Sequence, residues 1–65
     1  MKNKLKVLRA QRNLSQEDLA KILSVSRQTI NAIERKKYDP SLPLALRIAI
    51  VFEKKVEDIF ILDQE

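Results

Sequence analysis

The chain contains no histidine and no cysteine among its 65 residues. These two residue types supply the usual zinc ligands, the commonest general base and the thiol nucleophile, so their absence argues against a zinc site and against most enzymatic chemistry. A chain without cysteine also forms no disulfide, which fits a reducing compartment. We therefore expect a cytoplasmic protein that is not an enzyme and that uses neither a metal nor a cofactor.

Glycine is absent as well, so no glycine-rich loop can cradle a phosphate. The adjacent acids Glu17–Asp18 and Glu57–Asp58 form no acid/base dyad, because neighbours on a helix point about 100° apart. No apolar run reaches the ~18 residues of a membrane helix, since Arg47 interrupts the longest one. The N-terminus lacks the continuous apolar region of a signal peptide.

Charge is unevenly distributed along the chain. Residues 1–40 carry ten Lys/Arg and four Asp/Glu (+6), and residues 41–65 carry three and five (−2), which together give the net charge of +4. A basic face attracts the phosphates of nucleic acids. A membrane surface is the weaker alternative, because the first helix has few bulky apolar groups and the chain has no Trp.

The length predicts a single domain over residues 1–65, which buries only about 60% of its unfolded surface and gains from oligomerisation. Apolar residues one helical turn apart predict helices over about residues 4–12, two within 16–35, and others over 42–53 and 56–60. Ser15, Ser26 and Ser41 are predicted N-caps of three of them. The chain ends, residues 1–3 and 59–62, are candidate strands of a short antiparallel ribbon.

The two helices within residues 16–35 are joined by a tight turn, and the second has two distinct faces. Its apolar face carries Ile30 and Ile33, whereas polar side chains cover the opposite face. A first turn with Arg27 and Gln28 suits contacts with base edges in a DNA major groove. The alternative is an amphipathic surface helix whose polar face is simply solvated.

This segment resembles the helix-turn-helix of the XRE/Cro-type family, which includes the lambdoid phage repressors and short stand-alone regulators such as a cytolysin-operon repressor. The family's apolar, small and acidic positions are filled by Leu19, Leu23, Val25, Ile30, Ile33, Ala20 and Glu34. The resemblance covers about residues 5–60 and implies an all-α, five-helix, lambda-repressor-like DNA-binding domain. One departure is Ser24, where the family's turn often has glycine, which adopts positive φ without steric cost.

The positions of side chains on this motif predict their roles, because the first turn of the second helix would enter the groove most deeply and the other groups lie at its margins. The expected base contacts are Arg27, Gln28 and Asn31, and the expected phosphate contacts are Gln16, Ser26, Thr29, Arg35, Lys36, Lys37 and Tyr38. For the loop over residues 36–41, the alternative is a solvated segment without a DNA contact. The family pairs an arginine of the first helix with the acid of the second, here Arg9 with Glu34. Otherwise Glu34 pairs with Lys37 or faces solvent.

The C-terminal end has more apolar side chains than a short helix can turn inward. We expect Ile50, Val56, Ile59 and Phe60 to form a homodimer interface, the alternative being that they cover the first helix of a monomer. The predicted function is a transcriptional repressor that binds an inverted repeat in double-stranded DNA as a homodimer. The alternative is a protein-interaction module such as the antitoxin of a toxin–antitoxin pair.

Overall fold

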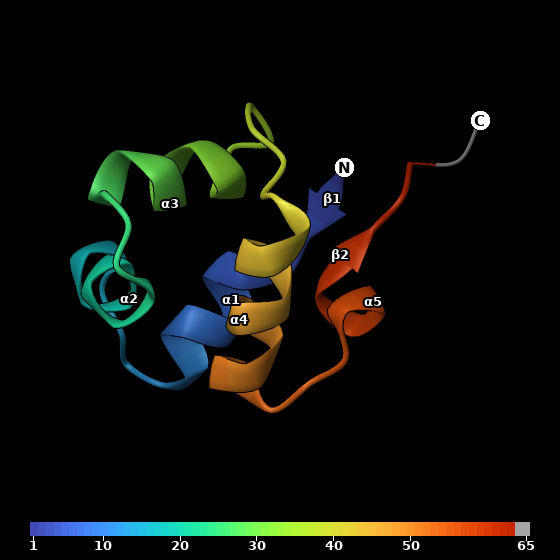
Figure 1. Cartoon of the computed structure of the whole chain (residues 1–65). Helices are drawn as coiled ribbons and strands as arrows, with labels where there is room; N and C mark the ends of the chain where they lie inside the picture. The colour runs from blue at the N-terminus through green and yellow to red at the C-terminus, as the bar shows by residue number, and fades with distance from the viewer. Residues whose placement is uncertain (64–65) are drawn as a thin grey trace.

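The computed structural model describes residues 1–63, in which five helices and a two-stranded ribbon are present (Figure 1). The elements are β1 (Lys2–Asn3), α1 (Leu5–Gln11), α2 (Gln16–Leu23), α3 (Arg27–Glu34), α4 (Leu42–Phe52), α5 (Val56–Ile59) and β2 (Phe60–Ile61). The five-helix prediction is confirmed, and the helix ends lie within a residue or so of those expected. The last two residues of the predicted domain, 64 and 65, lie outside the described part.

Three helices begin at the predicted serine N-caps. The Oγ atoms of Ser15, Ser26 and Ser41 accept the backbone N–H three residues later, at 2.9, 3.1 and 3.3 Å. At α2 the cap is reciprocal, because the Asp18 carboxylate accepts the Ser15 N–H at 3.0 Å. The hydrogen bond from the Ser15 backbone, followed by that from the Ser15 side-chain hydroxyl, lowers the pKa of the Asp18 carboxyl from its ordinary value.

Four helices end in a left-handed residue that is not glycine. Asn13, Ser24, Lys36 and Glu53 have φ of 56°, 59°, 63° and 55°. After α2, the Ser24 N–H donates to Lys21 O at 3.2 Å and the Val25 N–H to Ala20 O at 2.9 Å, the paired bonds of a Schellman motif. The same two bonds follow α1, α3 and α4. Ser24 thus has a positive φ at the position where the family's turn often has glycine, at a steric cost of about 1–2 kcal/mol for a non-glycine residue.

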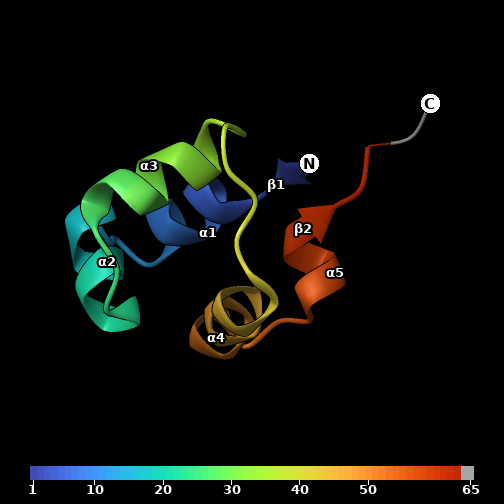
Figure 2. The same ribbon diagram turned by 45° about the horizontal axis from the view of Figure 1, so that its top comes forward.

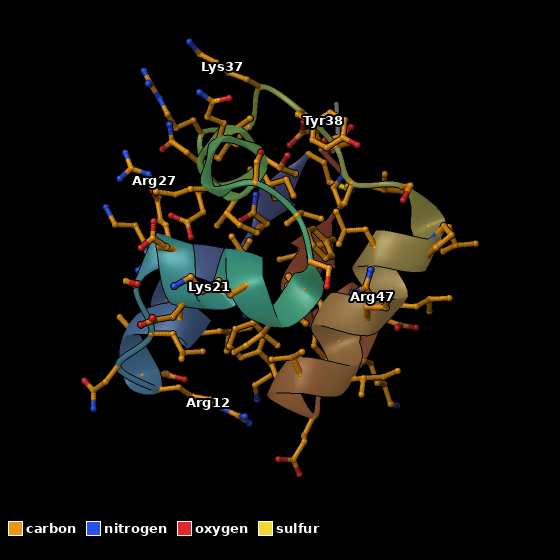
Figure 3. The ribbon with its side chains drawn as sticks, turned by 60° about the vertical axis from the view of Figure 1, so that its left-hand side comes forward. Arg12, Lys21, Arg27, Lys37, Tyr38 and Arg47 are labelled. Carbon is orange, nitrogen blue, oxygen red and sulfur yellow. The ribbon has the colours of Figure 1, made fainter. Side chains whose placement is uncertain are left out.

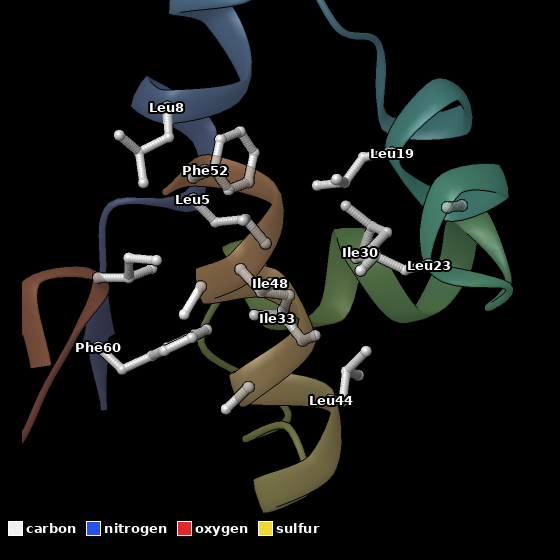
Figure 4. Close-up of a cluster of buried hydrophobic side chains, with 14 residues drawn as sticks. Leu5, Leu8, Leu19, Leu23, Ile30, Ile33, Leu44, Ile48, Phe52 and Phe60 are labelled. Atoms are coloured by element: carbon white, nitrogen blue, oxygen red, sulfur yellow. The ribbon is translucent and has the colours of Figure 1, made fainter. Parts of the chain in front are cut away.

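The core is built around α4, whose buried side chains face neighbours on several sides (Figure 4). In Figures 1 and 2, α2 and α3 lie on one side of α4, and α5 with the ribbon lies on the other. The core cluster consists of Leu5, Leu8, Leu19, Ala20, Leu23, Ile30, Ile33, Leu44, Ala45, Ile48, Ala49, Phe52, Ile59 and Phe60. Within residues 1–63, no helix is long and apolar enough to span a membrane.

The chain ends pair as the predicted antiparallel ribbon, with Lys2 opposite Ile61 and Asn3 opposite Phe60. The Asn3 side chain links this ribbon to two helices. Its Oδ1 accepts the Leu5 N–H at 3.2 Å at the start of α1, and its Nδ2 donates to Ile33 O at 2.9 Å near the end of α3. The ribbon therefore helps to fix the C-terminal end of α3.

Two of the four residues predicted at a dimer interface are part of the core. Ile59 is 0% exposed and Phe60 is 7% exposed, so the prediction that these side chains face a partner is wrong. The reason is the ribbon, since the Ile59 carbonyl accepts the Lys4 N–H at 2.9 Å and holds this segment against α1. Ile50, at 75% exposed, and the half-buried Val56 do lie at the surface.

Candidate nucleic-acid interface

The polar face of α3 is exposed at its first turn. Arg27 and Gln28 are both exposed, and the Arg27 side chain extends outward from the helix backbone (Figure 3). Ser26 enters the helix in an extended conformation, and its Oγ lies 2.9 Å from the Thr29 hydroxyl oxygen. The turn thus presents two long hydrogen-bonding side chains beside two hydroxyl groups.

Positive charge gathers where the chain leaves α3. Arg35, Lys36 and Lys37 are consecutive and exposed, and none of them forms an ion pair within residues 1–63. Tyr38, which is 46% exposed, follows them on the same loop (Figure 3). Uncompensated cations at both ends of an exposed helix face create a positive potential that favours a polyanion.

The predicted pair between Arg9 and Glu34 is present and largely buried. Arg9 Nε donates to Glu34 Oε2 at 2.8 Å and Nη2 donates to Oε1 at 3.1 Å, and the two side chains are 15% and 5% exposed. The hydrogen bond to Glu34 raises the pKa of the Arg9 guanidinium, although burial opposes the rise. Arg9 Nη1 also donates to Leu14 O at 2.8 Å. One arginine thereby ties α1, the loop after it and α3 together.

Gln16, the first residue of α2, lies beside this pair. Its Nε2 donates to Glu34 Oε1 at 3.1 Å and to Asn31 Oδ1 at 3.3 Å. The structure therefore brings Gln16, predicted to contact a phosphate, together with Asn31, predicted to contact a base. A phosphate contact by the Gln16 amide group would require one of these hydrogen bonds to break.

The α2–turn–α3 unit lies within a match to the helix-turn-helix family model over residues 5–59. The chain belongs to the helix-turn-helix family. It is a DNA-binding protein of the XRE type expected from its sequence, in a family of transcription regulators that are not enzymes.

Similar helix-turn-helix proteins match the chain over most of their length. An uncharacterized HTH-type transcriptional regulator of Methanocaldococcus jannaschii is 66% identical, over 100% of this chain and 98% of that protein. The uncharacterized HTH-type transcriptional regulator YgzD of Bacillus subtilis is 52% identical, over 100% and 98%. Among solved structures, the restriction-modification controller protein C.AhdI from Aeromonas hydrophila has a TM-score of 0.78 at 30% identity, covering 88% of this chain and 86% of its own.

The contacts of two arginines, one joining α2 to α4 and the other joining the end of α1 to α4, were not anticipated from the sequence. Arg47 Nη2 donates to Leu23 O at 2.6 Å at the end of α2 (Figure 3). Arg12 Nη1 donates to Val51 O at 2.8 Å, and its guanidinium carbon lies 5.5 Å from the centroid of the Phe52 ring. The single charge in an otherwise apolar helix was a usable signal for Arg47. Nothing in the local pattern distinguished Arg12 from the other exposed cations.

Proposed function

We propose that this helix-turn-helix protein represses transcription in the cytoplasm by binding an inverted-repeat operator in duplex DNA as a homodimer. The observation that carries the proposal is the exposed first turn of α3 with Arg27 and Gln28, together with the exposed cations at the other end of this helix, Arg35, Lys36 and Lys37, which form no ion pair within residues 1–63. A first turn of this kind suits insertion into a major groove, where side-chain amides and guanidinium groups read base edges. A bound dimer that overlaps a promoter would exclude the polymerase sterically.

Two classes of DNA contact follow from position on this surface. Arg27, Gln28 and Asn31 lie along one face of α3 and are the proposed base contacts. The proposed phosphate contacts lie at the margins of that face, where they would set the orientation of α3 in the groove: Ser26, Thr29, Arg35, Lys36, Lys37 and Tyr38.

The proposed dimer uses an exposed apolar stripe on α4. Leu42, Leu46 and Ile50 follow one another at intervals of four residues and are 68%, 48% and 75% exposed. A groove beside this stripe is lined by Leu46, Ala49, Ile50 and Val56, so α5 borders the same surface. An exposed apolar patch of this kind favours contact with its own copy about a two-fold axis. The proposed interface therefore consists of Ile50 and Val56, as expected from the sequence, together with Leu42 and Leu46.

The charge distribution supports a complex in which the α3 surface faces the DNA and the stripe on α4 faces the partner copy. The stripe belongs to residues 41–65, whose balance is −2, whereas the α3 surface belongs to residues 1–40, whose balance is +6. A two-fold axis at α4 would place two copies of α3 toward successive major grooves, about 34 Å apart along one face of the DNA. The half-site centres should therefore lie about one helical turn apart.

The DNA-binding proposal is tested by selection from a randomised duplex library, followed by titrations at several salt concentrations. We expect an inverted repeat. Gln28→Ala should cost about 1–3 kcal/mol on that site and much less on random DNA, because it removes a base contact. Lys36→Ala should weaken binding to all sequences alike and reduce the slope of log K against log salt by about one unit. Equal losses on selected and random DNA for Gln28→Ala would contradict the assignment of base contacts.

The dimer proposal is tested by analytical ultracentrifugation across micromolar concentrations. Ile50→Lys should give a folded monomer, because this side chain is already 75% exposed within one copy. Ile22→Lys is the matched control, since Ile22 is 51% exposed on α2, which contributes no residue to the groove beside the stripe, and it should leave association unchanged. A wild-type protein that stays monomeric at every concentration and protects one half-site would overturn the dimer.

A further inference from the structure

The orientation of the Gln16 amide is fixed by the carboxylate beside it. An ionised carboxylate only accepts hydrogen bonds, so the Gln16 atom 3.1 Å from Glu34 Oε1 must be the nitrogen. The same nitrogen lies 3.3 Å from Asn31 Oδ1. Because Gln16 Nε2 carries only two hydrogens, these two acceptors use both of them. Arg9 holds Glu34 in place through its own two hydrogen bonds.

The Asn31 amide is then oriented in turn. A nitrogen of Asn31 facing Gln16 Nε2 would set donor against donor, so the Asn31 atom on this side must be the oxygen. The two polar atoms of an amide group diverge from a single carbon. With Oδ1 directed at α2, Nδ2 is directed elsewhere, and the two atoms cannot both reach the edge of one base. Asn31 is half-buried and lies one turn after Arg27 on the face of α3 that carries the proposed base contacts.

We infer that Asn31 is a specificity-determining residue that acts only as a hydrogen-bond donor to DNA, and that Gln16 is the positioning residue that makes it so. This inference rests on the proposed function. A free asparagine reads adenine through two bonds, one accepted from N6 and one donated to N7. A donor-only amide loses that pairing and is suited to guanine, whose O6 and N7 are both acceptors in the major groove. Cytosine, which presents a donor there, is disfavoured.

The first test needs no DNA and uses the side-chain amide signals of the full chain in solution NMR. Both Gln16 Nε2 hydrogens should exchange with solvent more slowly than those of Gln11, which is an exposed glutamine on α1. Glu34→Gln should remove this protection, because the neutral amide no longer dictates the Gln16 orientation. Exchange at Gln16 as fast as at Gln11 would overturn the inference.

The second test compares base preferences in the selection experiment. Asn31→Ala identifies the base position that Asn31 reads, as the one whose preference it removes. At that position the wild type should favour guanine over adenine, and Gln16→Met should shift the ratio toward adenine by about tenfold, because Asn31 is then free to turn. Gln11→Met makes the same substitution at an exposed site and should leave the ratio unchanged. A lost phosphate contact alone would weaken all sequences equally and leave the ratio unchanged.

The outcomes separate this inference from the proposed function. A wild-type protein with no base preference at all would overturn the proposed function and the inference together. A clear inverted repeat in which Asn31→Ala removes a base preference but Gln16→Met leaves the ratio of guanine to adenine unchanged would overturn the inference alone. If Gln16→Met does not fold, as judged by circular dichroism, the exchange rates of the wild-type amides still decide the orientation.

Discussion

Replacing Arg9 by methionine should destabilise the domain severely. The substitution keeps much of the apolar stem but removes three donated hydrogen bonds, two to Glu34 and one to Leu14 O. It also leaves the Glu34 carboxylate, which is 5% exposed, with Gln16 as its one remaining side-chain donor within residues 1–63. Breaking a buried ion pair from one side typically costs 3–5 kcal/mol, and the partial exposure of Arg9 reduces this to about 2–4 kcal/mol.

The reverse substitution should be milder. Glu34→Gln leaves an arginine that is 15% exposed and still bonded to Leu14 O, so we expect a loss of about 1–2 kcal/mol. The double variant Arg9→Met, Glu34→Gln should be more stable than Arg9→Met alone, because it no longer buries an unpaired charge. A domain of this size has only about 3–10 kcal/mol of stability in total, so these differences are large.

Urea unfolding followed by circular dichroism, at one fixed protein concentration, measures these changes. Lys6→Met is the matched control, because Lys6 is an exposed cation on the same helix and should change the free energy of unfolding by less than about 0.5 kcal/mol. If Arg9→Met cost no more than Lys6→Met, or if the two single losses simply added in the double variant, the buried pair would have no special role.

Two further predictions concern the ends of α2. Ser24→Gly should raise the free energy of unfolding by about 0.5–1 kcal/mol, because glycine removes the left-handed strain at φ 59° at some cost in unfolded-chain entropy. Ser24→Ala should give no gain, because alanine keeps this strain. Urea midpoints measure both changes, and equal midpoints for Ser24→Gly and the wild type would contradict the prediction. The pKa of Asp18 is lower in the folded state, so the stability it contributes is present above its ordinary pKa and is lost as the pH falls through the folded value. Urea midpoints measured against pH should therefore fall less steeply on acidification for Asp18→Asn than for the wild type.

Much of this fold could be predicted because its signals are local. Three serines before apolar periodicity placed the helix starts, and a two-faced pattern identified α3. The pair between Arg9 and Glu34 required the family resemblance, since nothing in the spacing of two residues 25 positions apart indicates contact. The family resemblance likewise marked Ser24, where the turn often has glycine and φ is positive.

The predictions from the sequence that were wrong or missing concern tertiary contacts. α5 is a four-residue helix, too short for a periodicity that would separate its buried face from its exposed face, and Ile59 and Phe60 were therefore misplaced. Helical spacing also shows which residues share a face but not which distant carbonyl a long side chain reaches. That is why the bonds from Arg12 to Val51 O and from Arg47 to Leu23 O were not foreseen.

At Lys36, the left-handed residue after α3, the residue that would favour stability differs from the one that would favour DNA affinity. Lys36 has φ of 63°, so the conformation of the Schellman motif favours glycine there, yet glycine would remove a cation from the proposed phosphate-binding loop. Selection for a tighter fold and selection for tighter DNA binding should therefore favour opposite residues at position 36. At Asn13, Ser24 and Glu53, outside the proposed contact surface, no such conflict exists, and glycine could relieve strain without weakening the interaction with DNA.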